Sequence, residues 1–215
     1  MKKKILLDID EVFCFSGYLE LVNAFLHTNY SIDDFTEYYI DEVAIPKERK
    51  QEFYEFISTK NQYENPVLLP GAIATIKALS KYYDIYPCSD CRNPFDMKNS
   101  GRIFKSKFEM LYRLIPEDVI PPKNYIFTGA KSICVADIQI DDLVSNLNPA
   151  IPVKILFPSY HNKNVSDEEL RAKGIIRAGY DYHTGWEKIA KILLAPELLK
   201  KEELIEDGPK LQRTK

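Results

Sequence analysis

The stretch Lys4-Ile5-Leu6-Leu7-Asp8-Ile9-Asp10-Glu11-Val12 sets the framework for the whole chain. Its apolar run, Ile5 to Leu7, predicts a buried strand of a parallel sheet, and the run stops at Asp8 and Asp10. In open α/β sheets, ligands bind just beyond the carboxyl ends of the strands. One carboxylate could therefore act as a nucleophile and the other as an acid/base, with a hard cation between them. A strand followed by an acidic turn is the alternative interpretation.

The composition is that of an ordinary soluble globular protein, and it argues against several classes of partner. Of the 215 residues, 45% are hydrophobic and 28% are charged, and the net charge is -3. No basic surface for a nucleic acid polymer is indicated, and no apolar run approaches the roughly 20 residues that span a bilayer. Lysines at positions 2–4 could mimic the start of a signal peptide, but Asp8 interrupts the apolar stretch behind them. We therefore expect a cytoplasmic protein without membrane contact.

Four cysteines raise the question of redox or zinc chemistry. Cys88 and Cys91 form a C-x-x-C pair, whereas Cys14 and Cys134 stand alone. A zinc ribbon would need a second close pair. Reduced thiols packed near strand ends are the favoured interpretation.

The segment 15–65 is rich in aromatic residues and carries helical patterns. Helices are predicted over 15–27, from Ser31 onward, and from Pro46 to Ser58. Because this segment follows the first strand, we interpret it as an inserted helical cap on a catalytic core formed by 1–14 and 66–195. A helical layer without ligand contact is the alternative. The charged tail, 196–215, could be a surface helix or disordered.

The rest of the chain alternates between strand and helix patterns. The expected strands are 82–88, 125–127, 134–140, 153–157 and 175–176, and the expected helices are 72–81, 98–114 and 185–194. This alternation predicts an α/β fold, a Rossmann-like three-layer parallel sheet core.

Four expected strands are followed by polar residues that suit one chemistry. These are Asp8/Asp10, Ser89, Lys131 and Asp141/Asp142. The carboxylates offer oxygens to Mg²⁺, the serine offers a hydroxyl to a phosphoryl oxygen, and the lysine offers a cation. Asp8 could then attack phosphorus, while Asp10 protonates the leaving oxygen and later activates water against the aspartyl-phosphate.

These motifs resemble those of the haloacid dehalogenase-like phosphohydrolases, and more narrowly the 5'(3')-deoxyribonucleotidase branch. Asp8-Ile9-Asp10 is similar to the first motif, Ser89 to the second, Lys131 to the third and 137–142 to the fourth. The resemblance implies that Asp8 is the nucleophile and Asp10 the acid/base. It also implies that Asp8, the main-chain carbonyl of Asp10 and Asp142 hold Mg²⁺, with Asp141 in support. The implied substrate is a deoxyribonucleoside monophosphate.

Three positions depart from the pattern of that branch. Glu11 stands where Gly is usual, Ser89-Asp90-Cys91 replaces Thr-Ser-Pro, and Gly129 stands where relatives often carry Arg. Ser89, Asp90 and Lys131 are the expected phosphate-binding residues, and the departure at 89–91 leaves open which groups there donate to the phosphate. Substrate identity is therefore left open.

Other side chains carry weaker expectations. Among the aromatic residues near the first motif and in the cap, Phe15 is the candidate for stacking on a base, although core packing is the commoner role for each. Lys98, Lys105 and Lys107 could reach a phosphate, but a solvated helix face is the favoured interpretation. His27, His161 and His183 show no metal-ligand spacing, and Trp186 is interpreted as helix packing.

Three functions compete at this stage. The first is a Mg²⁺-dependent phosphatase for deoxyribonucleoside monophosphates, and the second is a phosphatase for another small phosphomonoester. The third is a phospho-acceptor or a nucleotide-binding protein without turnover. The order of the motifs and the insertion after the first strand argue against a receiver domain. A homodimer is one assembly that the sequence leaves undecided.

Overall fold

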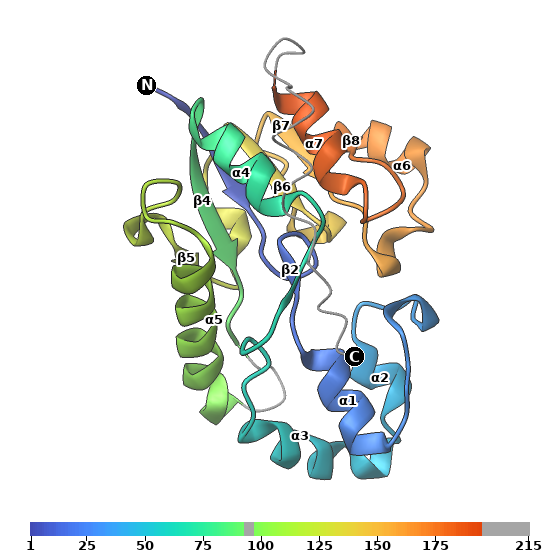
Figure 1. The fold of residues 1–215 in the computed structure, drawn as a ribbon. Helices are drawn as coiled ribbons and strands as arrows, with labels where there is room; N and C mark the ends of the chain where they lie inside the picture. Colours follow the sequence, from blue (N-terminus) through green and yellow to red (C-terminus); the bar gives the residue numbers. More distant parts are fainter. Residues whose placement is uncertain (93–96, 195–215) are drawn as a thin grey trace, which may run out of the picture.

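The computed structural model describes residues 1–92 and 97–194, and Figure 1 shows how their elements are arranged. The strands are β1 (Lys3–Leu7), β2 (Cys14–Phe15), β3 (Val67–Leu68), β4 (Tyr83–Ser89), β5 (Ile126–Phe127), β6 (Ile138–Asp141), β7 (Val153–Leu156) and β8 (Ile175–Arg177). The α-helices are α1 (Tyr18–Leu26), α2 (Ile40–Ala44), α3 (Lys50–Ser58), α4 (Ala72–Ser80), α5 (Ser100–Leu114), α6 (Asp167–Ala172) and α7 (Gly185–Leu193). Residue 195 and the predicted tail, 196–215, lie outside the described residues.

Six strands form a parallel sheet in the order β5-β4-β1-β6-β7-β8. Leu7 at the end of β1 lies opposite Pro87 of β4 on one side and Ile140 of β6 on the other. Because the strands are parallel and in this register, the residues that follow β1, β4 and β6 meet at one edge of the sheet. The expected α/β class with a parallel sheet is confirmed.

Residues of β1 alternate between two hydrophobic clusters, as the period of a strand requires. Ile5 and Leu7 belong to the main cluster, to which α4, α5 and α7 contribute, whereas Leu6 packs with Cys88 and Ile151 on the other face. Figure 1 shows α4 and α7 side by side against the sheet, and the two helices are in contact. The central residues of β1 are therefore buried, alternately on one face of the sheet and on the other.

Trp186 of α7 is fully buried and connects the core to the loop that follows Asp10. Its indole N–H donates to the carbonyl of Val12 at 2.7 Å, and its ring packs against Phe157. The predicted packing role of Trp186 is confirmed. A buried indole with a satisfied N–H holds this loop in one place, which matters because the loop carries the first acidic motif.

The helices between β2 and β3 have a hydrophobic cluster of their own. Val22, Phe25 and Phe53 are at its centre, and Tyr160 joins it from the loop after β7. The antiparallel pair β2–β3, which the sequence did not predict, closes the insertion by placing Phe15 opposite Val67. Figure 1 shows α1, α2 and α3 grouped at one end of the molecule, away from α4 and α7. The division into core and cap at 15 and 65 stays a prediction.

Several predicted boundaries shift. The helix expected from Ser31 is the 3-10 turn Ile32–Asp34, and the one expected from Pro46 is the 3-10 turn Lys47–Arg49 followed by α3. The strand expected over 134–140 begins only at Ile138, because the chain first makes the 3-10 turn Lys131–Ile133. Helix α6 was not predicted. None of the helices in the described part of the chain has the length and apolar character needed to cross a membrane.

Candidate active site

The acidic and polar residues after β1, β4 and β6 gather at one edge of the sheet. Asp8 follows β1 directly, and its amide donates to the carbonyl of Ile140 at 2.9 Å. Ser89 and Asp141 are the last residues of β4 and β6. All three side chains are buried. The register of the sheet therefore brings residues more than 130 positions apart into one small polar cluster.

Lys131 lies between two of these carboxylates. Its Nζ is 2.7 Å from Oδ2 of Asp8 and 2.7 Å from Oδ2 of Asp141. Burial by itself would lower the pKa of Lys131, but the two neighbouring carboxylates raise it above its usual value. Asp141 is held further by the Leu143 amide and the Asn146 side chain, each at 3.1 Å. The structure thus places a permanent ammonium ion against the candidate nucleophile.

A second buried ammonium ion, that of Lys107, holds Asp10. Its Nζ is 2.6 Å from Oδ2 of Asp10, and it donates to the hydroxyl of Ser89 at 2.8 Å and to the carbonyl of Asp90 at 2.6 Å. The hydroxyl of Tyr63 donates to the other oxygen of Asp10 at 2.8 Å. Both oxygens of the candidate acid/base are therefore oriented by the protein.

The interpretation of Lys107 as part of a solvated helix face is wrong. Lys107 is 1% exposed, while Lys98 and Lys105 are exposed as expected. On helix α5, Lys107 shares a face with the buried residues Met110 and Leu111, three and four positions further along. A lysine in phase with an apolar stripe was the signal in the sequence that could have identified it.

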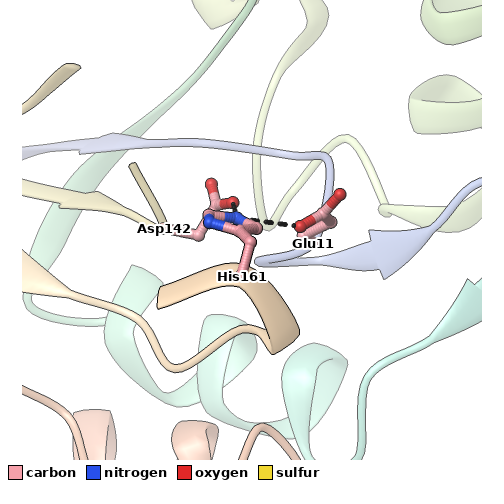
Figure 2. A group of neighbouring side chains, drawn as sticks. All are labelled: Glu11, Asp142 and His161. Atoms are coloured by element: carbon pink, nitrogen blue, oxygen red, sulfur yellow. Dashed lines mark hydrogen bonds and ion pairs between the residues drawn. The ribbon is translucent and has the colours of Figure 1, made fainter. Parts of the chain in front are cut away.

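A histidine joins two further carboxylates, as Figure 2 shows. Nε2 of His161 is 2.7 Å from Oδ2 of Asp142 and 3.1 Å from Oε2 of Glu11. Ser159 donates to Oε2 of Glu11 at 2.8 Å, and the hydroxyl of Tyr160 is 3.2 Å from Oε1. Glu11 adopts the left-handed conformation, with φ of 61°. Its carboxylate therefore connects the loop after β1 to the loop after β7.

The spacing of the histidines in the sequence did not identify His161 as a site residue, and the structure adds it to the site. His161 lies 19 positions from Asp142 and 150 from Glu11, so no local spacing relates them. Burial would lower the pKa of His161, but the hydrogen bonds with Asp142 and Glu11 raise it to about 10. The two carboxylates therefore favour the charged form of the imidazole. His27 and His183 are exposed and lie outside this cluster.

Asp90, an expected phosphate-binding residue, has its carboxylate bound to Arg92. Nε of Arg92 is 3.0 Å from both carboxylate oxygens of Asp90, and Nη2 is 2.7 Å from Oδ2. The side chain of Arg92 packs against Gly129. An aspartate side chain would repel a phosphate, so Asp90 can contribute to phosphate binding through its main chain and through its hold on Arg92.

The central cluster contains more negative charge than positive charge. Five carboxylates meet three cations: Asp8, Asp10, Glu11, Asp141 and Asp142 against Lys107, Lys131 and His161. Within the described cluster, two negative charges are left without a counter-ion when every carboxylate is ionised. Burial and the charge of Asp8 accordingly raise the pKa of Asp141 to about 7, and burial raises that of Asp142.

This imbalance and the geometry fit a divalent cation. Asp8, Asp141 and Asp142 each offer a carboxylate oxygen, and these atoms lie within 4.8 Å of one another. Hard divalent cations prefer oxygen ligands of this kind.

The four cysteines are free, and neither group of clustered metal-ligand side chains in the described residues includes a cysteine. The reduced state of these thiols stays a prediction.

Part of the cluster lines a cleft of about 530 Å³ between the sheet edge and the helical insertion, whereas Asp142 and His161 line a second cavity. Floor residues include Asp8, Ser89 and Lys131, and the aromatic side chains at its wall are Phe15, Tyr18, Tyr38, Tyr39 and Tyr63. Phe15, the candidate for stacking on a base, is partly buried and makes an edge contact with Tyr182 at 5.3 Å between ring centroids. The volume is sufficient for a small organic phosphate.

A family comparison identifies the group of proteins to which this site belongs. Residues 2–176 match the family described as "5' nucleotidase, deoxy (Pyrimidine), cytosolic type C protein". The chain belongs to this family. The resemblance inferred from the four motifs is thereby confirmed.

Relatives of this nucleotidase family match about half of the chain. A 5'(3')-deoxyribonucleotidase of Bacillus subtilis is 34% identical over 102 residues, which cover 47% of this chain and 55% of that protein. A putative 5'(3')-deoxyribonucleotidase of Staphylococcus epidermidis is 31% identical over 102 residues, covering 47% of this chain and 52% of that protein. The chain thus spans about half the length of the curated relatives that it matches.

Solved structures with a similar chain course include two haloacid dehalogenase-like hydrolases. One, a putative hydrolase from Bacteroides fragilis, is 14% identical, with a TM-score of 0.49 and coverage of 82% of this chain and 96% of that one. The other, from Xanthomonas campestris, is 12% identical, with a TM-score of 0.48 and coverage of 89% and 96%.

Proposed function

We propose that this member of the nucleotidase family is a Mg²⁺-dependent phosphatase that hydrolyses deoxyribonucleoside monophosphates through an aspartyl-phosphate. One observation carries the proposal: the two carboxylates of the first motif, Asp8 and Asp10, are each held by a separate buried lysine. Each acid is thus oriented by its own cation, and the Tyr63 hydroxyl adds a donor to Asp10 alone, which supports separate tasks for the two acids.

In this mechanism Asp8 is the nucleophile. Its carboxylate oxygen forms a bond to phosphorus while the bond from phosphorus to the ester oxygen breaks, and Asp10 gives a proton to the departing oxygen. Water then attacks the aspartyl-phosphate, with Asp10 taking the proton, and phosphate leaves. Lys107 and Tyr63 keep Asp10 facing the reacting atoms through both steps.

The phosphate is bound by groups on the cleft floor. The Ser89 hydroxyl and the Lys131 ammonium are donors for its oxygens, and the main chain at Asp90 adds to them. Lys131 also neutralises charge that develops on phosphorus oxygens as Asp8 attacks, because it is already 2.7 Å from that carboxylate.

Asp8, the main-chain carbonyl of Asp10 and Asp142 would hold Mg²⁺, with Asp141 in support. The bound ion would neutralise charge on the phosphate oxygens and on the carboxylates around it. His161 holds one oxygen of Asp142 at 2.7 Å, which leaves the other for the metal.

The substrate class rests on the family and on the cleft. The curated relatives are named 5'(3')-deoxyribonucleotidases, and the cleft adds aromatic walls to a phosphate-binding floor. In this proposal the insertion over 15–65 acts as the cap, and Phe15 contacts the base. A small monoester also suits a chain with a net charge of -3 better than a nucleic acid polymer does.

The test is phosphate release from ribo- and deoxyribonucleoside monophosphates and sugar phosphates, with Mg²⁺ and with EDTA. We expect release from deoxyribonucleotides that requires Mg²⁺ and is lost in Asp8→Asn, while Asp118→Asn, which changes an exposed acid, retains it. If phosphate were released only from sugar phosphates, the proposed substrate class would change from nucleotides to sugar phosphates. No release from any compound, with wild type equal to Asp8→Asn, would contradict the enzyme assignment and leave a binding protein.

A further inference from the structure

Arg92 and Gly129 pack together at the wall of the cleft. A Cβ atom placed on Gly129 would lie 2.2 Å from Nη2 of Arg92 and 2.5 Å from Cζ. Gly129 does not have a positive φ, so its backbone alone does not require glycine. The missing side chain instead provides the space in which the guanidinium of Arg92 lies.

Asp90 sets the orientation of this guanidinium. Its carboxylate accepts hydrogen bonds from Nε and Nη2 of Arg92, and also from the Arg92 amide at 2.8 Å. Asp90 is itself anchored, because its carbonyl accepts from the buried Lys107. A planar guanidinium gripped along one edge presents its other edge in a defined direction. Within the described chain, no hydrogen bond engages Nη1, the donor on that other edge.

Arg92 is more exposed to solvent than the phosphate-binding groups of the cleft. Its side chain is 59% exposed, whereas Lys131 is 6% and Ser89 is 1% exposed. All three line the same cleft, and Tyr39 of the helical insertion lines it as well. A phosphate on the floor would therefore place the organic part of the ester, not the phosphate, beside Arg92.

We propose that Arg92 is a substrate-binding residue whose Nη1 donates to an oxygen acceptor on the sugar of the bound monophosphate, and that Gly129 supplies the space this contact requires. This inference rests on the proposed function and adds a specificity-determining residue to it. An aryl phosphate, which has no sugar, would not make the contact.

The test compares two substrates in two variants. For Arg92→Ala we expect KM for dUMP to rise about ten-fold, since one hydrogen bond from a charged donor is lost. KM for p-nitrophenyl phosphate should change less than two-fold. For Arg92→Lys we expect a KM for dUMP between those of wild type and Arg92→Ala, because lysine keeps the charge but lacks the planar guanidinium. Lys105→Ala, which removes an exposed cation of α5, is the matched control and should leave both values unchanged.

Gly129→Ala tests the packing separately. The added methyl group would displace the guanidinium of Arg92. Because Gly129 has no positive φ, alanine fits its backbone conformation, and we expect the same rise in KM for dUMP as in Arg92→Ala. In the Arg92→Ala background, Gly129→Ala should have no further effect, because the clash has been removed. Thermal unfolding of each variant would verify that the fold is retained.

Three results would overturn the inference. An equal rise in KM for both substrates would place Arg92 on the phosphate, and no rise for dUMP would remove it from the substrate. Independent, additive effects of the two substitutions would reject the role of Gly129. If wild type released no phosphate from nucleotides, the proposed function would fail separately. Calorimetric binding of dUMP would then decide: weaker binding by Arg92→Ala supports the contact, and equal or absent binding by both proteins rejects it.

Discussion

Asp8 separates two regions of the site that differ in how they hold their carboxylates. In one region, the lysine side, Lys131 binds Asp8 and Asp141, and Lys107 binds Asp10. Lys131 lies in a 3-10 turn and Lys107 in helix α5. On the histidine side, His161 holds Asp142 and Glu11 from two loops. In the proposed mechanism the two lysines place positive charge beside the phosphate, whereas His161 orients a metal ligand.

The difference is also one of chemistry. The ammonium ions bring three donors each and lie where charge develops in phosphoryl transfer. His161 instead shares its Nε2 between two carboxylates, so it orients Asp142 and Glu11. Substitutions on the lysine side should therefore reduce kcat, and those on the histidine side should change the response to metal.

The largest effect is expected for Lys131→Met. Asp8 and Asp141 would lose their shared cation, and the phosphate would lose a donor, so kcat should fall by about 10³-fold. Steady-state phosphate release at saturating Mg²⁺ measures it, with the exposed Lys81→Met as control. A kcat within two-fold of wild type would remove Lys131 from the mechanism.

Lys107→Met is expected to have the next largest effect. Methionine fills the space of the lysine stem but leaves Asp10 and Ser89 without their common donor, so kcat should fall by about 10²-fold through poorer placement of the acid/base. The same assay measures it, and Lys105→Met on the exposed face of α5 is the control. Equal activity would show that burial of Lys107 serves the fold alone.

His161→Asn should act mainly on the metal. Without the bond to Asp142, the Mg²⁺ concentration that gives half-maximal activity should rise by about 10-fold, the lower end of the range for residues that orient a metal ligand. kcat at saturating Mg²⁺ should change less. A fall in kcat with an unchanged metal midpoint would place His161 in the chemical steps and remove the distinction between the two sides.

The smallest effect concerns the backbone of Glu11. Because its φ is 61°, Glu11→Gly should be more stable than Glu11→Ala by about 1 kcal/mol, since glycine adopts this conformation without the steric cost of a Cβ. Denaturant unfolding in EDTA measures the difference. His27, with φ of 56° and an exposed side chain, should show the same order for its glycine and alanine variants. The reverse order at Glu11 alone would show that the loop changes its conformation.

Local patterns in the sequence accounted for most of the sheet and for the polar strand ends. A short apolar run is enough to predict a buried strand, because side chains alternate between the two faces of a sheet. Parallel strands then bring their carboxyl ends to one edge of the sheet. For that reason Asp8, Ser89, Lys131, Asp141 and Asp142 could be grouped from sequence alone. Short elements were missed, α6 and the β2–β3 pair among them, because a few residues do not establish a period.

The tertiary structure alone decided which charges meet across long separations. Lys107 reaches Asp10 over 97 positions, and His161 reaches Glu11 over 150. Neither pairing has a local signature, because both depend on how α5 and the loop after β7 pack against the sheet. The same holds for Arg92, whose place depends on a glycine 37 positions away. The sequence by itself determined which acids lie at the edge of the sheet together with Lys131, and packing determined that Lys107 and His161 join them.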